Sequence, residues 1–326
     1  MPAGDTNGDV LAATGRYAAG LVADAAQHQD VAVWHLRAGR WHVHDLGDFG
    51  LTSPFSGLSA TGVNRRGVVV VGVNISAVGA WVYTHGRIHR LKDFAGGRLA
   101  FVRAINNHGE MVGEALDAQG NDFGAIWWHW WSRPVKLRPV SGYDGSFAQG
   151  LNDRGDVVGG SFSNGPLHQL AVRWDPSGRV HRLRGLGGDA AAWSANVRLR
   201  TVGEATTAGD TKYAVVWGPH GHVRNLGLFA GDEFSRAMGV APNGDVVGFA
   251  GTNPAPPAIP ERQVIFWPGH GPLRSLLPLS RHWADGAYAH TLTSQGDVFG
   301  ASAAAAGALP QPTEWTCALQ QSFVPR

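Results

Sequence analysis

The chain has 326 residues and a formal net charge of +2, and only 16% of its residues are charged. Lys and Arg are scattered, so neither a nucleic-acid-binding stripe nor a polybasic membrane patch is indicated. No apolar run approaches the roughly 20 residues of a membrane-spanning helix, and the single cysteine, Cys317, excludes an intramolecular disulfide. The N-terminus lacks the basic and apolar regions of a signal peptide, so we expect a cytoplasmic protein, or an extracellular one if a leader was removed.

Short apolar runs bounded by Gly, Asn and Pro recur along the chain, which indicates strands rather than helices. Each unit reads as a strand A, a tight Asn-Gly turn, a Val-rich strand B, a strand C with a Trp, and a polar strand D. Asn and Gly tolerate the positive φ of such turns. The predicted A-to-B turns are residues 7–10, 64–67, 106–109, 152–155, 196–199, 242–244 and 294–296. The strand-C tryptophans are Trp34, Trp81, Trp128, Trp174, Trp217, Trp267 and Trp315.

These tryptophans recur about every 47 residues, which is the period of four-stranded propeller blades. Leucine-rich and β-helix repeats are shorter, and ankyrin and tetratricopeptide repeats need a helical periodicity that is absent here. The sequence therefore predicts an all-β protein: a seven-bladed β-propeller of four-stranded antiparallel blades. A single domain over residues 1–326 accommodates the seven repeats.

The strand nearest the axis decides which residues can form a site. One connection per repeat must cross the blade, a span of roughly 14 Å at ~4.8 Å per strand. Only the D-to-A or the B-to-C link is long enough, so either strand A or strand C is innermost. The small residues of strand A favour strand A, with the chain beginning in a vestigial strand A at residues 1–5. With strand C innermost, the N-terminal strands would instead complete the last blade.

If strand A is innermost, alternate residues of each A strand face the axis and form two stacked rings. The first predicted ring is Ser59, Phe101, Phe147, Trp193, Arg236 and Tyr288. The second predicted ring is Thr61, Arg103, Gln149, Ala195, Met238 and His290. A mostly apolar lining with a few polar groups is typical of a small-molecule site. The same aromatic side chains can also be read as a plug that fills the axis.

Several ring residues suggest chemistry. His290 is the best candidate for a general acid or base, with Tyr288 beside it in the transfer of protons. Arg103 and Arg236 would hold an anionic or carbonyl oxygen. The residues expected to shape the substrate are Phe101, Phe147, Gln149, Trp193 and Met238. These roles suit a cofactor-independent cyclase, isomerase or lyase acting on an apolar or aromatic substrate.

Acidic residues precede several A strands and would form a rim on one face of the propeller. They are Asp144, Asp189, Asp232 with Glu233, and Asp285. Asp is common in such loops as a turn cap, and the alternative is recognition of a cation or amine, or a general base. The chain has 15 histidines, but pairs such as His42 and His44 lack a third ligand. We expect no metal and no cofactor.

Residues 147–160 read F-A-Q-G-L-N-D-R-G-D-V-V-G-G, followed by A-V-R-W at 171–174 and L-R-G-L-G-G at 183–188. This pattern resembles the HAF-type repeat of bacterial, often extracellular, proteins. It is also similar to kelch repeats, whose second strand ends in a Gly pair, as residues 159–160 do here. The resemblance covers nearly the whole chain and implies a propeller with strand A innermost. Neither repeat carries a shared catalytic set.

Two functions follow as hypotheses. The first is a propeller that binds a small molecule at its axis and acts on it as an enzyme. The second is a non-catalytic scaffold that binds a protein or a glycan on one face. The run Trp127-Trp128-His129-Trp130-Trp131 bears on the second, because Trp127 and Trp131 are candidates for exposed aromatic residues. A wedge between blades is the other interpretation of this run.

Overall fold

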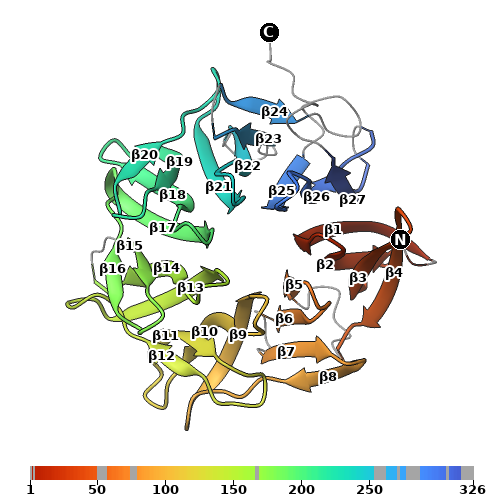
Figure 1. Cartoon of the computed structure of the whole chain (residues 1–326), viewed down its shortest axis with the longest axis horizontal. Helices are drawn as coiled ribbons and strands as arrows, with labels where there is room; N and C mark the ends of the chain where they lie inside the picture. The colour runs from red at the N-terminus through yellow and green to blue at the C-terminus, as the bar shows by residue number, and fades with distance from the viewer. Residues whose placement is uncertain are drawn as a thin grey trace.

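The computed structural model describes residues 2, 4–49, 57–73, 79–165, 169–252, 262–269, 272–276, 287–305 and 308–316. Within these residues the chain forms 27 strands and no helix, and so no helix that could cross a membrane. Consecutive strands form seven antiparallel sheets, six with four strands and one with three described strands. Figure 1 shows the seven sheets standing around a common axis. The predicted seven-bladed β-propeller is confirmed.

We number the blades 1 to 7 in chain order. Blade 1 contains β1 (Asp5–Thr14), β2 (Tyr17–Asp24), β3 (Gln29–Arg37) and β4 (Arg40–Gly47). Blade 2 contains β5 (Leu58–Val63), β6 (Val69–Val73), β7 (Gly79–Thr84) and β8 (Arg87–Arg90). Blade 3 contains β9 (Arg98–Ile105), β10 (Met111–Leu116), β11 (Asp122–Trp127) and β12 (Val135–Leu137). Blade 4 contains β13 (Gly145–Leu151), β14 (Val157–Phe162), β15 (Leu170–Trp174) and β16 (Val180–Arg182).

The remaining blades follow the same order. Blade 5 contains β17 (Gly187–Ala195), β18 (Thr201–Thr207), β19 (Lys212–Trp217) and β20 (Val223–Asn225). Blade 6 contains β21 (Phe234–Val240), β22 (Val246–Gly251), β23 (Arg262–Trp267) and β24 (Arg274–Leu276). Blade 7 contains β25 (Ala287–Leu292), β26 (Val298–Ser302) and β27 (Gln311–Trp315).

Strand A is innermost in every blade. The first strands β1, β5, β9, β13, β17, β21 and β25 each contact the first strands of both neighbouring blades, and β25 contacts β1 to complete the circle. β1 pairs within its own sheet rather than with blade 7. The ring closes through hydrogen bonds between blades 7 and 1, from the Gly8 amide to the Pro310 carbonyl (3.0 Å) and from Gln311 Nε2 to the Thr6 carbonyl (2.8 Å).

Blade 1 departs from the predicted register. Residues 7–10 are not a turn, because β1 begins at Asp5 and continues to Thr14. Asn7 and Gly8 pair with strand β2 instead. The A-to-B turn lies after Thr14, where Gly15 has the positive φ of 55° that the tight turn requires. Asn7 and Gly8 therefore lie within a strand, and Gly15 forms the turn of the hairpin instead.

The strand-C tryptophans join neighbouring blades. Three of them are fully buried, and each indole N–H donates to a backbone carbonyl just beyond strand D of the preceding blade. The pairs are Trp127 to Lys92 (2.8 Å), Trp174 to Arg138 (2.7 Å) and Trp217 to Arg184 (2.7 Å). Each indole therefore buries its ring between two sheets and satisfies its one polar group there.

The alignment of two tryptophans was wrong. In blade 3 the buried residue is Trp127, which pairs with the first residue of β10, whereas Trp128 is 38% exposed. In blade 2, Tyr83 occupies the corresponding position opposite Val69, and Trp81 lies two residues earlier. Spacing alone does not distinguish adjacent tryptophans, because burial depends on the direction of each side chain.

A chain of asparagine side chains connects the A-to-B turns. Asn64, Asn106, Asn152 and Asn196 are buried, and each Oδ1 accepts the amides two and four residues later in its own turn. Each Nδ2 donates to the carbonyl at the equivalent position of the next blade. The distances are 3.2 Å to Asn106, 3.1 Å to Asn152, 3.0 Å to Asn196 and 2.9 Å to Ala241. We call this chain the asparagine ladder.

Every strand A carries a β-bulge at the same place. The bulged residues, which have no partner on strand B, are Leu11, Thr61, Arg103, Gln149, Trp193, Met238 and His290. In six blades a glycine of strand B faces the residue before the bulge, because the bulge brings a carbonyl close to strand B. A Cβ on Gly159 would lie 2.0 Å from the Phe147 carbonyl oxygen. The repeated Val-Val-Gly of strand B thus permits the bulge.

The asparagine ladder should contribute to stability. Asn152→Ala leaves the amides of Arg154 and Asp156 and the carbonyl of Asn196 without their partner, so we expect a loss of about 2 kcal/mol in the free energy of unfolding. Urea unfolding followed by tryptophan fluorescence measures this. Asn121→Ala, at an exposed turn residue, is the matched control and should change stability by less than about 0.5 kcal/mol. Equal unfolding midpoints for the two variants would contradict the expectation.

Candidate functional site

A cavity of about 380 Å³ lies on the propeller axis and is lined by the A strands of all seven blades. It extends to the ends of these strands, at residues such as Val63, Leu151 and Val240, so it occupies the half of the axis next to the A-to-B turns. Each blade contributes its bulged residue: Leu11, Thr61, Arg103, Gln149, Trp193, Met238 and His290. The lining therefore mixes apolar, hydroxyl, amide, guanidinium, indole and imidazole groups.

Five residues of the predicted second ring line this cavity: Thr61, Arg103, Gln149, Met238 and His290. Two positions differ from the prediction. Blade 5 contributes Trp193 instead of Ala195, because Trp193 lies three residues before Asn196, as Gln149 lies three residues before Asn152, and the predicted alignment of this strand was two residues out of register. Blade 1 contributes Leu11, which the misplaced turn at residues 7–10 concealed.

The predicted first ring lies deeper along the strands, and of its members only Ser59 and Trp193 line the cavity. Phe147 folds over Gly160 of its own blade, and Phe101 folds over Gly72 of blade 2. A Cβ on either glycine would lie within 2.7 Å of the facing phenyl ring. The phenyl groups of Phe101 and Phe147 fill the space above these glycines, so they pack on the sheets and do not shape the cavity.

Both arginines are paired with glutamates of strand B. Arg103 Nη2 lies 2.6 Å from Glu114 Oε1, and its guanidinium stacks 4.2 Å from the centre of the Phe101 ring. Arg103 Nε is buried without a hydrogen-bond partner in the described structure. Burial and the charge of Glu114 raise the pKa of nearby Asp122 to about 6, although Arg103 opposes this. Arg103 therefore lies beside two acidic groups.

Arg236 forms a two-pronged ion pair with Glu204 of blade 5, with Nε at 2.6 Å and Nη2 at 3.2 Å from the carboxylate. Its guanidinium lies 4.8 Å from the centre of the Trp193 ring. The Trp193 indole nitrogen is buried without a partner among the described residues. Arg236 thus holds Trp193 in place and is itself neutralised, while the indole N–H and Arg103 Nε are donors without acceptors.

His290 is hydrogen bonded to an acid that the sequence analysis missed. Its Nε2 lies 2.9 Å from Asp9 Oδ2, across the junction of blades 7 and 1. Burial opposes the charged imidazolium, but the charge of Asp9 and the hydrogen bond outweigh burial and raise the pKa of His290. Asp9 occupies the first-ring position of blade 1, and the correct strand register would have revealed it. Tyr288 lies two residues before His290 and does not line the cavity.

The acidic residues predicted to form a rim accept hydrogen bonds from nearby chain segments, within one blade for Asp144 and Asp232 and between blades 4 and 5 for Asp189. Asp144 accepts the Asn164 amide and Asp189 accepts the Gln169 amide, both at 2.7 Å. Asp232 accepts Gln263 Nε2 at 3.1 and 3.2 Å. Asp285 lies outside the described residues. These bonds fit the interpretation of turn capping, and the described residues contain no group of three potential metal ligands.

The comparisons with known proteins support the fold. No protein-family model and no curated protein matches the chain. It is similar to the β-propeller domain of the trilobed protease from Pyrococcus furiosus, at 8% identity over 95% of this chain and 94% of that one, with a TM-score of 0.58. It is also similar to puromycin hydrolase (15% identity, TM-score 0.56) and to TolB from Acinetobacter baumannii (15%, 0.53).

The chain covers 53% of the puromycin hydrolase and 65% of the TolB chain. At these identities the likeness shows the propeller fold alone. The resemblance to HAF-type and kelch repeats stays a prediction, since no family model matches.

The Asp9–His290 pair has a measurable signature. Asp9→Asn keeps the shape and a hydrogen-bonding oxygen but removes the charge, so the pKa of His290 should fall. NMR titration of the His290 ring protons measures this, with Asp210→Asn, in an exposed turn, as the charge-matched control.

The same pair makes stability depend on pH. Because the folded pKa of His290 is raised, its stabilising contribution is complete below its unfolded pKa of about 6.5. The contribution is lost as the pH rises through the folded value, and this dependence should weaken in Asp9→Asn. An unchanged His290 titration in Asp9→Asn would contradict the assignment.

Proposed function

We propose that the protein binds a small organic molecule in the axial cavity, one with an apolar or aromatic body and an anionic or carbonyl oxygen. The observation that carries the proposal is the convergence of seven bulged side chains, one from each blade, on a single cavity of about 380 Å³. The lining combines apolar side chains with a few polar ones from different blades, and convergent polar groups of this kind fix the orientation of small molecules in binding sites.

The two buried donors without partners define the polar end of the ligand. Arg103 Nε and Trp193 Nε1 are buried, and a buried donor without an acceptor costs about 1–3 kcal/mol. Both residues line the cavity, so rotation of either side chain toward it would let a ligand oxygen accept from the donor and remove this cost. The indole face of Trp193 offers an aromatic surface beside its N–H. An aryl carboxylate or an aryl ketone has both features.

The Asp9–His290 pair supports a catalytic role at the same place. The carboxylate orients the imidazole and stabilises its protonated form, as the partner of a general acid–base histidine does. His290 lines the cavity, so a bound molecule lies within its reach. The chemistry that needs only proton transfer beside a polarised carbonyl is isomerisation, cyclisation or elimination without a cofactor.

Arg103→Lys keeps the positive charge beside the polar end of the ligand but changes the number and geometry of the N–H donors. Lysine can keep the ion pair with Glu114, but it lacks the Nε donor, so we expect 1-naphthoate to bind about tenfold more weakly. Titration calorimetry measures the affinity, and Arg179→Lys, at an exposed position, is the control.

His290→Ala should leave the fold intact and abolish turnover in a substrate screen. Naphthoate binding that is absent or indifferent to Arg103→Lys would refute the binding proposal, and undiminished turnover in His290→Ala would refute the catalytic one.

A second candidate function, glycan recognition, is favoured by the aromatic cluster on the outer part of blade 3. Trp131 is 55% exposed and stacks on His129 at 4.7 Å, and its ring meets Trp130 edge-on at 5.4 Å. Trp130 in turn stacks on His89 of blade 2 at 4.0 Å. Exposed, rigidly held indole faces suit the apolar face of a sugar ring.

This second function predicts that Trp131→Ala abolishes retention of the protein on polysaccharide gels in affinity electrophoresis, because the stacking face is lost. Leu309→Ala, which removes an exposed apolar side chain elsewhere, is the control and should be retained like the wild type. Equal mobility of wild type and Trp131→Ala in every polysaccharide would exclude this surface, whatever the result at the axis.

A further inference from the structure

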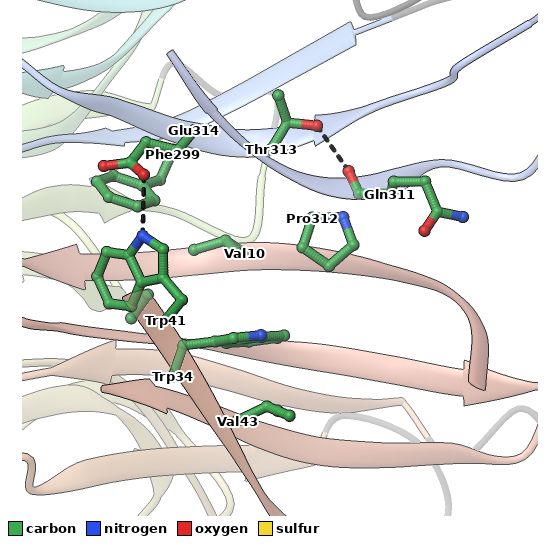
Figure 2. Close-up of a pocket in the computed structure, with 10 residues that line it drawn as sticks. Val10, Trp34, Trp41, Val43, Phe299, Gln311, Pro312, Thr313 and Glu314 are labelled. Atoms are coloured by element: carbon green, nitrogen blue, oxygen red, sulfur yellow. Dashed lines mark hydrogen bonds between the residues drawn. The ribbon is translucent and has the colours of Figure 1, made fainter. Parts of the chain in front are cut away.

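A second cavity, of about 350 Å³, lies between blades 7 and 1, away from the axial lining. Figure 2 shows Trp34 and Trp41 of blade 1 on one side and Phe299 and Glu314 of blade 7 on the other. Trp41 and Phe299 meet edge to face, with ring centres 5.8 Å apart. The cavity is therefore an aromatic enclosure formed by two blades.

Glu314 is the only ionisable residue in this lining. Its Oε2 accepts a hydrogen bond of 2.9 Å from Trp41 Nε1, the contact drawn in Figure 2. No described Lys, Arg or His forms an ion pair with it. Burial raises the pKa of Glu314, the Trp41 hydrogen bond opposes this, and the charge of Asp297 raises the pKa further. A carboxylate thus faces an aromatic cavity, and no basic side chain of the described residues balances its charge.

We propose that this cavity, which we call the seam pocket, binds an organic ammonium ion whose charge Glu314 balances. Aromatic faces attract cations through their quadrupoles, most strongly when the cation is desolvated. The lining also contains the apolar residues Val10, Val43 and Pro312, which suit alkyl groups on the nitrogen, and the polar residues Gln311 and Thr313. A methylated ammonium fits better than a primary amine, because it brings no N–H groups that need several acceptors. A metal ion would need more oxygen ligands than one carboxylate supplies.

The seam pocket rests on residues other than those of the axial site. It shares no lining residue with the axial cavity, so ligand binding there is independent of the proposed axial function. A cation between Glu314 of blade 7 and Trp34 of blade 1 would contact both sides of the ring closure. It should therefore stabilise the folded protein by an amount that rises with the logarithm of its concentration once that exceeds the dissociation constant.

Choline and 3,3-dimethylbutan-1-ol test the proposal as a charged and neutral pair of nearly equal shape. Titration calorimetry on the full chain should show choline binding at least tenfold more tightly than the alcohol. Glu314→Gln keeps an oxygen for the Trp41 hydrogen bond and removes the charge, so it should lose this preference. Asp210→Asn removes one exposed charge elsewhere and should behave like the wild type. Lowering the pH through the pKa of Glu314 should weaken choline binding to the wild type only.

The outcomes are distinct from those at the axis. Choline binding should persist in Arg103→Lys, so failure of the axial proposal leaves this one standing. The circular dichroism spectrum of Glu314→Gln verifies that the variant folds, and Trp41→Leu, which removes the aromatic face while keeping Glu314, gives a second way to lose binding. Equal affinities for choline and the alcohol, or a choline affinity unchanged in both variants, would overturn the proposal.

Discussion

The hydrogen bond from a turn asparagine to the backbone of the next blade is the interaction on which the ring depends. The side chain is fixed by two amides of its own turn, so its remaining donor points at one place on the neighbouring blade. A short, fully bonded side chain of this kind allows only one spacing between blades. The ladder runs from Asn64 to Ala241 and so sets the positions of blades 2 to 6 relative to one another.

The junction of blades 6, 7 and 1 is held by other means. Ala241 and Thr293 take the places of asparagine there, and strand β1 adds the Gly8–Pro310 and Thr6–Gln311 bonds. The Asp9–His290 pair crosses the same junction. Two of the features proposed to have functional roles, the acid–base pair and the seam pocket, thus lie where the repeated contact is interrupted.

Much of the fold could be predicted from the sequence, because Asn-Gly turns, Val-Val-Gly strands and tryptophans recur at a nearly constant spacing. The choice of strand A as innermost followed from small residues such as Ala148. The register of single blades was harder: strand A of blade 5 was aligned two residues out of register, which placed Trp193 in the wrong ring, and Gly15, instead of Gly8, closes the first hairpin.

The charge pairs of the site were beyond sequence reasoning for a different reason. Glu114 and Glu204 lie on strand B, 11 and 32 residues from the arginines they neutralise. Arg103 and Glu114 belong to one blade, but Glu204 belongs to blade 5 and Arg236 to blade 6, so the second pair depends on how two blades pack. Both guanidinium groups predicted to hold a ligand oxygen are therefore ion-paired, and of their nitrogens Arg103 Nε is buried without a partner among the described residues.

The bulge also bears on how such a protein can diversify. The seven bulged residues of strand A have no pairing partner on strand B, so exchanging a side chain at one of these positions leaves the pairing of the sheet unchanged. Those same seven side chains are the ones that meet at the centre. A lineage with this frame can thus change what the centre recognises by altering one blade at a time, with the architecture preserved throughout.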